Sequence, residues 1–152
     1  MPRAKPLPRN AFAAFNSHQT RWNDNDQFGH LYNVAYFELF DNAMNNWLMA
    51  RGMLAQNGPE PIPVVAEASC SYLREVSYPD IVEIGMRVTH MGNSSFKLTL
   101  GMFRAGEDLA AAQADFTMVF VAPDTHKPRP APPHYRAELA KLVIPEDSTA
   151  AP

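Results

Sequence analysis

Cysteine is nearly absent from this chain, since Cys70 is the single one among 152 residues. One cysteine cannot form an intrachain disulfide, which fits a reducing compartment such as the cytoplasm. Long hydrophobic runs are absent as well, because no stretch of 18 or more apolar residues occurs, and no membrane span is expected. Clustered basic residues are also lacking and the net charge is −3, so a nucleic-acid-binding surface is not expected.

Two common catalytic motifs are missing too. The sequence has no G-x-S-x-G nucleophile elbow, which argues against a serine hydrolase of the α/β type. It has no Gly-rich phosphate loop either, so nucleoside-triphosphate chemistry is not expected. The chemistry must therefore come from other residue types.

The length and composition indicate one domain with a sizeable core, since 46% of the residues are hydrophobic. Residues 1–14 contain three prolines and only basic charges. They are expected to be a loosely held tail, with an organelle-targeting peptide as the alternative. Residues 15–140 then form the domain, and residues 141–152 form a C-terminal tail.

The segment from Asn33 to Gly52 predicts one long helix, because it contains no proline and no internal glycine. Asn33 is a candidate N-cap and Gly52 a candidate C-terminal stop. Apolar residues recur at the three- and four-residue spacing of one helix face, namely Tyr36, Phe40, Ala43, Met44 and Trp47.

The rest of the chain predicts strands. A short strand is expected at residues 16–24, a loop at 56–63 and a second strand at 64–76. Alternating apolar residues after Asp80 and after Ser95 predict two more strands, the first with one buried face. Residues 109–122 are assigned to a fifth strand despite their alanines, and a short helix is expected in the Pro-rich end. Short connections favour antiparallel pairing, so the prediction is an α+β domain with one sheet curled around one helix. The open sheet edge favours pairing into a dimer.

The stretch RWNDNDQFGHLYNVAY, residues 21–36, concentrates the candidate chemistry. Asp24, Asp26 and His30 could ligate a metal, although structural and catalytic metal sites usually need three or four suitable ligands. They could equally organise a polar turn through hydrogen bonds to backbone N–H groups. A third interpretation is catalytic: a carboxylate placed just before a helix N-terminus can attack a carbonyl or activate water, while the helix N–H groups polarise that carbonyl. Cys70 is expected to be a small core residue, with a catalytic nucleophile as the alternative. Glu67 is expected to be a solvent-facing strand residue, with a second catalytic carboxylate as the alternative.

The same stretch resembles the opening of hotdog-fold acyl-CoA thioesterases of the 4-hydroxybenzoyl-CoA thioesterase type. That pattern is an aromatic residue, then D-x-D-x-x-G-H, then an asparagine before a helix rich in Tyr and Phe. Here its positions are Trp22, Asp24, Asp26, Gly29, His30, Asn33, Tyr36 and Phe37. The later stretches YLREVSYPDIVEIGMRV and VAPDTHKPRPAPPHYRAEL also resemble the family, so the resemblance covers about residues 15–140.

The resemblance implies a five-stranded antiparallel sheet wrapped around one long helix, in a homodimer that is often doubled to a homotetramer. It implies an acyl-CoA substrate. Neither a metal nor another cofactor is expected, since Asp24, Asp26 and His30 have no second histidine close by in the sequence. The catalytic carboxylate falls on Asp26 and the carbonyl-polarising N–H near Asn33, while Asp24 holds the turn. The substrate pocket would be shaped by Gly29, His30, Tyr32 and Tyr36.

Several questions stay open at this point. Tyr32 stands where many members of the family have asparagine, which changes either the acyl pocket or only its rim. Arg74 and Arg87 are candidates for the phosphates of coenzyme A, with ordinary surface arginines as the alternative. An enoyl-CoA hydratase or dehydratase, or a non-catalytic acyl-CoA-binding protein, are the alternative functions.

Overall fold

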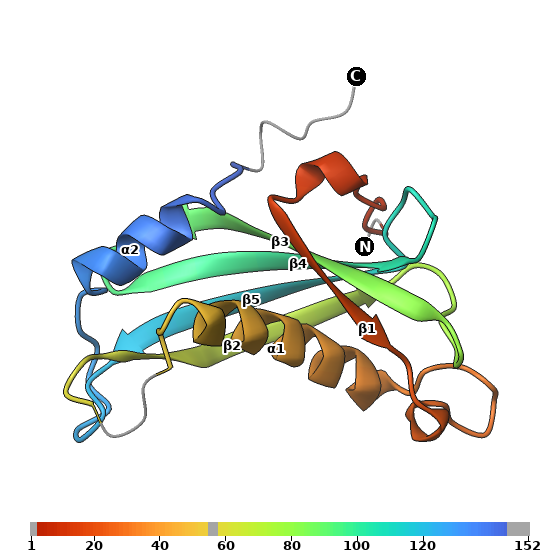
Figure 1. Cartoon of the computed structure of the whole chain (residues 1–152), viewed down its shortest axis with the longest axis horizontal. Helices are drawn as coiled ribbons and strands as arrows, with labels where there is room; N and C mark the ends of the chain where they lie inside the picture. The colour runs from red at the N-terminus through yellow and green to blue at the C-terminus, as the bar shows by residue number, and fades with distance from the viewer. Residues whose placement is uncertain (1–2, 55–57, 146–152) are drawn as a thin grey trace.

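A computed structural model describes residues 3–54 and 58–145 (Figure 1). Its centre is one five-stranded antiparallel sheet with the strand order β1-β3-β4-β5-β2. The elements in chain order are η1 (Arg9–Ala11), β1 (Ala14–Gln19), η2 (Trp22–Asp24), α1 (Asn33–Ala50), β2 (Ile62–Tyr72), β3 (Ile81–Met91), β4 (Ser95–Arg104), β5 (Ala112–Val121) and α2 (Pro133–Ala140). The predicted α+β fold, with one sheet around one long helix, is confirmed.

Helix α1 lies along one face of the sheet because one side of it is apolar. The helix ends where predicted, at a backbone turn that Gly52 makes possible with a φ of +72°. The Met53 N–H donates to the Leu48 carbonyl and the Gly52 N–H to the Met49 carbonyl, both at 3.0 Å. The buried side chains of α1 are Ala35, Tyr36, Leu39, Phe40, Ala43, Met44, Trp47 and Leu48.

The predicted N-cap of α1 is wrong. The helix begins at Asn33 itself, and the capping position is Tyr32, whose extended backbone has no side-chain capping bond. The Asn33 side-chain oxygen instead accepts a hydrogen bond from the hydroxyl of Tyr72, which lies at the end of β2. A tertiary contact therefore determines the orientation of this asparagine.

The central strands are buried on both faces, where one buried face was predicted for β3. Val82, Ile84, Met86 and Val88 face the core as expected. Gly85 and Arg87 of the opposite face are buried as well, because residues 3–13 cross that face of the sheet. We call residues 3–13 the N-terminal strap, and Figure 1 shows its η1 on the side of the sheet opposite to α1.

The strap is held by Phe12, which fills a slot made by two glycines. Gly85 of β3 and Gly101 of β4 are register partners. A Cβ atom on either would lie only 2.7 or 2.5 Å from the Phe12 ring, so no larger residue fits without displacing it. Ala11 is fully buried beside it. A loosely held tail over residues 1–14 was expected, and residues 7–13 differ from it because they bury apolar side chains.

Two boundaries also differ from the sequence-based prediction. The first strand ends at Gln19 rather than at residue 24, because residues 22–24 form η2. The second strand runs over Ile62–Tyr72, so residues 73–76 belong to the following loop. Residues 56 and 57 of the predicted loop lie outside the described residues.

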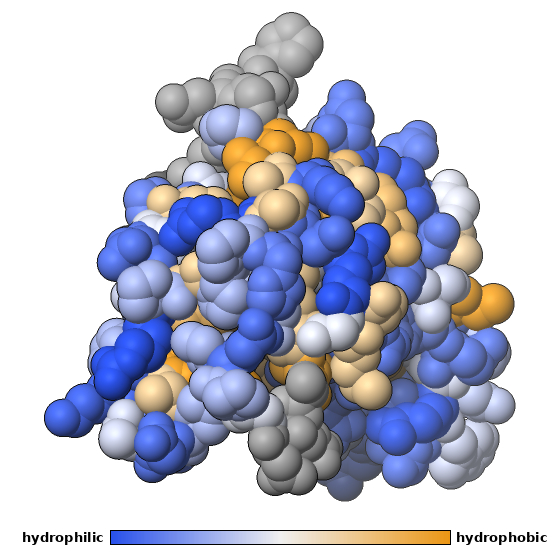
Figure 2. All heavy atoms as spheres, turned by 60° about the vertical axis from the view of Figure 1, so that its left-hand side comes forward, coloured by the Kyte–Doolittle hydropathy of each residue, from blue (hydrophilic) through white to orange (hydrophobic). Residues whose placement is uncertain are grey.

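Helix α2, the predicted last helix, closes the end of the core near the C-terminus of α1. The Tyr135 ring packs 6.1 Å from that of Phe120, centroid to centroid. The face in Figure 2 is mostly hydrophilic, with small groups of apolar residues between. Among the described helices, none combines the length and apolar character needed to span a bilayer.

Candidate functional site

The two aspartates of the motif loop, residues 24–31, have different surroundings. Asp24 is 1% exposed, and its carboxylate accepts the Arg21 backbone N–H and the Arg21 guanidinium, each at 2.7 Å. Burial alone would raise the pKa of Asp24, but the hydrogen bonds and charge of Arg21 outweigh burial and hold this pKa below its usual value. The Asp24 carbonyl also accepts the Tyr32 N–H, so this residue ties the start of the loop to its end.

Asp26 is exposed, and its side chain stabilises the turn of the loop through a hydrogen bond. Its Oδ1 accepts the Phe28 N–H at 2.8 Å, and its backbone N–H donates to the His30 carbonyl at 2.9 Å. Gly29 has a φ of +84°, a backbone conformation that glycine adopts without steric strain. No other atom occupies the space where a Cβ would lie. The loop therefore leaves one carboxylate buried and paired, and the other in contact with solvent.

Because Asp24 is buried and paired with Arg21, we expect the stability of the folded protein to depend on pH. Replacing Asp24 with asparagine is expected to lower the free energy of unfolding by about 1.5 to 3 kcal/mol near pH 7, the range for hydrogen bonds to a charged group. Because the pKa is lowered in the folded state, this contribution is present above pH 4 and is lost as the pH falls further. Urea unfolding at pH 7 and pH 3 measures it. An identical difference between wild type and variant at both pH values would contradict this assignment.

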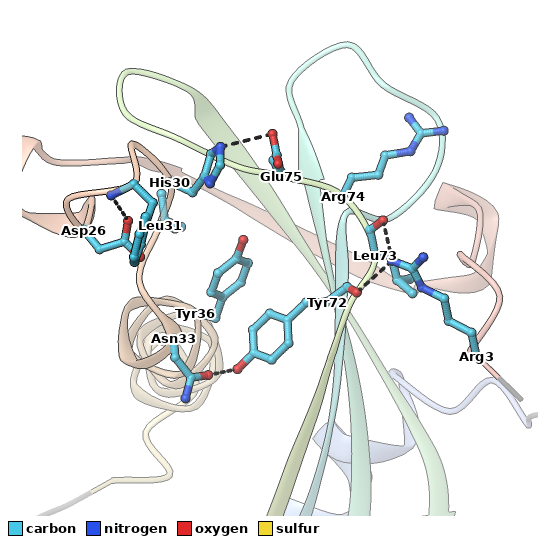
Figure 3. A pocket seen from close by; sticks show the side chains of 11 residues that line it. Arg3, Asp26, His30, Leu31, Asn33, Tyr36, Tyr72, Leu73, Arg74 and Glu75 are labelled. Atoms are coloured by element: carbon cyan, nitrogen blue, oxygen red, sulfur yellow. Dashed lines mark hydrogen bonds and ion pairs between the residues drawn. The ribbon is translucent and has the colours of Figure 1, made fainter. Parts of the chain in front are cut away.

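Asp26 lies at a pocket of about 750 Å³ that gathers most of the predicted site residues (Figure 3). Of those residues, the pocket is lined by Asp26, His30, Asn33, Tyr36 and Arg74. They come from the motif loop, the first turn of α1 and the loop after β2. Phe28 also lines it, as do five residues that the sequence did not point to: Arg3, Leu31, Tyr72, Leu73 and Glu75.

Two tyrosines lie side by side between the polar groups of this pocket (Figure 3). The rings of Tyr36 and Tyr72 meet edge to face with centroids 4.8 Å apart. Burial raises the pKa of Tyr36, and burial together with Cys70 raises the pKa of Tyr72 to about 12. Both phenols are therefore neutral hydrogen-bond donors near neutral pH. On the other side of the pocket, the His30 ring nitrogen lies 3.1 Å from the carboxylate of Glu75.

The pocket also contains the start of a helix. The first N–H groups of an α-helix have no partner within the helix, and the helix dipole makes this end positive. Asn33 is the first residue of the 18-residue α1, and it lines the same pocket as Asp26. A carboxylate and an electropositive helix end thus share one solvent-accessible cavity, an arrangement suited to chemistry at a carbonyl group.

Three predicted substrate-binding residues are not among those lining the pocket. Gly29 supplies backbone conformation, and Tyr32 is half-buried against the core. Arg87 is 3% exposed beneath the strap, on the opposite face of the sheet, with its guanidinium 5.9 Å from the Phe12 ring centroid. It was expected on a solvent-facing surface, and the strap is the reason that it is buried.

The other candidates can be placed as well. Cys70 is half-buried against the core, and burial raises the pKa of its thiol to about 11. Glu67 is exposed and lines a different, smaller cavity beside Lys97. Within residues 3–54 and 58–145, no three His, Cys, Asp or Glu side chains cluster closely enough to hold a metal ion.

Comparison with known proteins agrees with this architecture. The family model of the thioesterase-like superfamily matches residues 20–139. Uncharacterized protein YsmA of Bacillus subtilis (strain 168) is 30% identical over 90 residues, which span 59% of this chain and 60% of that protein. The chain therefore covers less than two thirds of that relative.

Two solved structures cover nearly the whole fold. The PA5185 protein from Pseudomonas aeruginosa PAO1 is 37% identical, with a TM-score of 0.87 over 97% of this chain and 99% of that one. A thioesterase from Thermus thermophilus, complexed with coenzyme A and Zn, is 25% identical, with a TM-score of 0.73 over 87% of this chain and 95% of that one. With its hotdog fold and a family model that matches most of its length, this chain belongs to the thioesterase-like superfamily.

Proposed function

We propose that this protein hydrolyses an acyl-CoA thioester to a free carboxylic acid and coenzyme A. The observation that carries the proposal is the shared pocket of Asp26 and the N-terminus of α1. Membership of the thioesterase-like superfamily supports thioester hydrolysis in general. The structural relative that is complexed with coenzyme A supports coenzyme A as the thiol part of the substrate.

In this proposal the substrate carbonyl lies between the Asp26 carboxylate and the N–H groups at Asn33. Asp26 either removes a proton from a water molecule that adds to the carbonyl carbon, or adds to that carbon itself to form an anhydride that water then hydrolyses. The oxyanion of each tetrahedral intermediate is stabilised by the helix N–H groups. The carbon–sulfur bond breaks, and coenzyme A leaves as a thiolate that takes up a proton. Since a thiolate is a good leaving group, a Ser-His-Asp triad is not required.

The remaining pocket residues would orient the substrate. The Tyr72 hydroxyl fixes the Asn33 side chain, and the pair of His30 and Glu75 borders the opposite side. Arg74, which pairs with Glu107 at 3.1 Å, would meet the phosphates of coenzyme A at the rim. Self-association into a homodimer or homotetramer is part of the same proposal, because β1 and β2 lie at the edges of the sheet.

A panel of aliphatic and aromatic acyl-CoA thioesters, read by release of free thiol, tests the proposal. Saturable thiol release by the wild-type protein is the expected result. Binding of acyl-CoA in calorimetry without thiol release from any member of the panel would overturn it. Loss of the enoyl absorbance of crotonyl-CoA without thiol release would favour a hydratase instead.

Cys70 offers a test of which residue acts as the nucleophile. The Cys70→Ala variant is expected to keep kcat within about twofold of wild type, because a thiol with a pKa near 11 is almost entirely protonated at pH 7. Steady-state thiol release, with the fraction of folded protein checked by circular dichroism, measures this. Loss of activity in a folded variant would place the chemistry on Cys70 rather than on Asp26.

A further inference from the structure

The N-terminal strap reaches the pocket from the other side of the sheet. Arg3, at its beginning, donates through Nη2 to the carbonyl oxygens of Tyr72 at 3.2 Å and Leu73 at 3.1 Å. Arg3, Tyr72 and Leu73 all line the candidate active-site pocket (Figure 3). A residue 23 positions before Asp26 therefore borders the same cavity.

The middle of the strap is fixed to the start of β5. The Leu7 N–H donates to the Gln113 side chain, and the Ala110 N–H donates to the Leu7 carbonyl at 3.0 Å. Pro8 and Leu109 form an isolated antiparallel bridge. These bonds direct the chain from the outer face of the sheet to the end of β2.

The far end of the strap is fixed by aromatic packing. Phe12 occupies the slot between Gly85 and Gly101, and its ring meets that of Phe103 edge to face at 5.7 Å. Arg9 adds a salt bridge to Glu83 at 2.9 Å. Because these contacts hold residues 7–12 in place, the position of Arg3 depends on them.

Two arginines, Arg74 and Arg3, line the pocket, and they differ in their partners. The Arg74 guanidinium is paired with Glu107, and Glu75 is paired with His30. The two bonds of Arg3 go to uncharged carbonyl groups instead, so they hold the guanidinium without neutralising its charge. A guanidinium has five N–H donors in a planar fork that suits phosphate oxygens, and these bonds use Nη2 alone.

We propose that Arg3 is a specificity-determining residue that binds a phosphate group of the coenzyme A moiety at the mouth of the pocket, and that Phe12 is a positioning residue that holds the strap for this purpose. The inference rests on the proposed function, since it assigns a binding partner to the anionic part of the same substrate. It adds a segment outside the matched family region, which begins at residue 20.

The test compares an acyl-CoA with the corresponding acyl-pantetheine, which carries the same thioester but no phosphate. Arg3→Ala is expected to raise KM for the acyl-CoA about three- to tenfold, within the range for a partly exposed ionic hydrogen bond. The kcat should stay within about twofold, and KM for the acyl-pantetheine should not change. Arg3→Lys should recover part of the affinity, since the charge remains.

Arg136→Ala is a matched control. Its Nη2 also donates to two successive carbonyls, of Gly92 at 2.8 Å and Asn93 at 2.9 Å, but it does not border the pocket. The control should leave KM for both substrates at the wild-type value. If Arg3→Ala raises KM equally for acyl-CoA and acyl-pantetheine, or leaves both unchanged, phosphate binding by Arg3 is wrong.

The role of Phe12 has its own readout. Phe12→Leu, which keeps apolar volume in the slot but loses the ring, is expected to raise KM for acyl-CoA and not for acyl-pantetheine. Combined with Arg3→Ala it should add nothing further, because both changes remove the same contact. Additive effects of the two changes would show that Phe12 does not act through Arg3.

Failure of the proposed function can be told apart from failure of this inference. If the wild-type protein releases no thiol from any acyl-CoA, the proposed function is wrong, and binding of coenzyme A in calorimetry then decides the role of Arg3. Binding weakened at least about threefold by Arg3→Ala but not by Arg136→Ala supports that role. Equal affinity in the three proteins, or no binding by wild type, overturns it.

Discussion

Replacing Asp26 with asparagine is expected to lower kcat for acyl-CoA hydrolysis by about 10²- to 10⁴-fold, the range for loss of a positioned acid–base group. Asparagine keeps an oxygen that can accept the Phe28 N–H, so the bond that shapes the loop is preserved. It lacks the negative charge and basicity needed to attack a carbonyl or to activate water. The substitution thus separates the chemistry of the side chain from its structural contact.

The chain provides a matched control for this change. Asp124 also accepts a nearby backbone N–H through Oδ1, that of Thr125 at 2.8 Å, but does not border the pocket. Asp124→Asn should leave kcat and KM at the wild-type values. Thiol release over a range of substrate concentrations gives kcat and KM for both variants. An Asp26→Asn protein that hydrolyses the panel as fast as wild type would remove Asp26 from the mechanism.

The second large effect is expected on stability. Phe40 is fully buried in the middle of α1 and is among the largest residues in the core. Phe40→Ala leaves a cavity that its neighbours fill only partly, which costs about 3 to 5 kcal/mol in the free energy of unfolding. Since small domains are stable by only about 5 to 15 kcal/mol, this is a large share of the total. Chemical denaturation followed by circular dichroism measures it.

Met49 on the same helix is the comparison for this change, because its side chain is 65% exposed. Met49→Ala removes apolar atoms from solvent rather than from the core, and alanine is a good helix former. The expected change is within about 0.5 kcal/mol. Equal destabilisation by the two substitutions would mean that α1 does not pack on the sheet as described.

Much of the fold follows from residue periodicity. The three- and four-residue spacing of Tyr36, Phe40 and Trp47 predicts α1, and its stop at Gly52 follows from the freedom of glycine at positive φ. The alternation of Val82, Ile84 and Met86 predicts β3. Such local signals determine an element and one of its faces.

The strap was missed because its signal is not local. Phe12 alone is an ordinary apolar residue near three prolines, and Gly85 and Gly101 look like weak points in two strands. Only the register of β3 and β4 puts the two glycines opposite each other and creates the slot. The burial of Arg87 follows from the same contact and was missed with it.

The candidate site was predicted to the extent that it lies in one stretch of sequence. Asp26, His30 and Asn33 were predicted as site residues because the D-x-x-G-H turn before a helix start resembles the motif of the thioesterase family. Tyr72 is separated from its partner Asn33 by 39 positions, and Arg3 lies 69 positions before Tyr72. Periodicity carries no information on such pairs, so only the folded chain could bring them to the pocket.

The paired glycines have a consequence for evolution and for protein engineering. They lie on the face of the sheet opposite to α1, yet the N-terminal strap that they hold begins with Arg3, which lines the pocket. In the proposed role of Arg3, a substitution at Gly101 would displace Phe12 and weaken binding of acyl-CoA relative to acyl-pantetheine, although Gly101 does not contact the substrate. Laboratory selection for a thioester that lacks the phosphates of coenzyme A would therefore return changes in this slot together with changes in the pocket, and a library restricted to pocket residues would omit them.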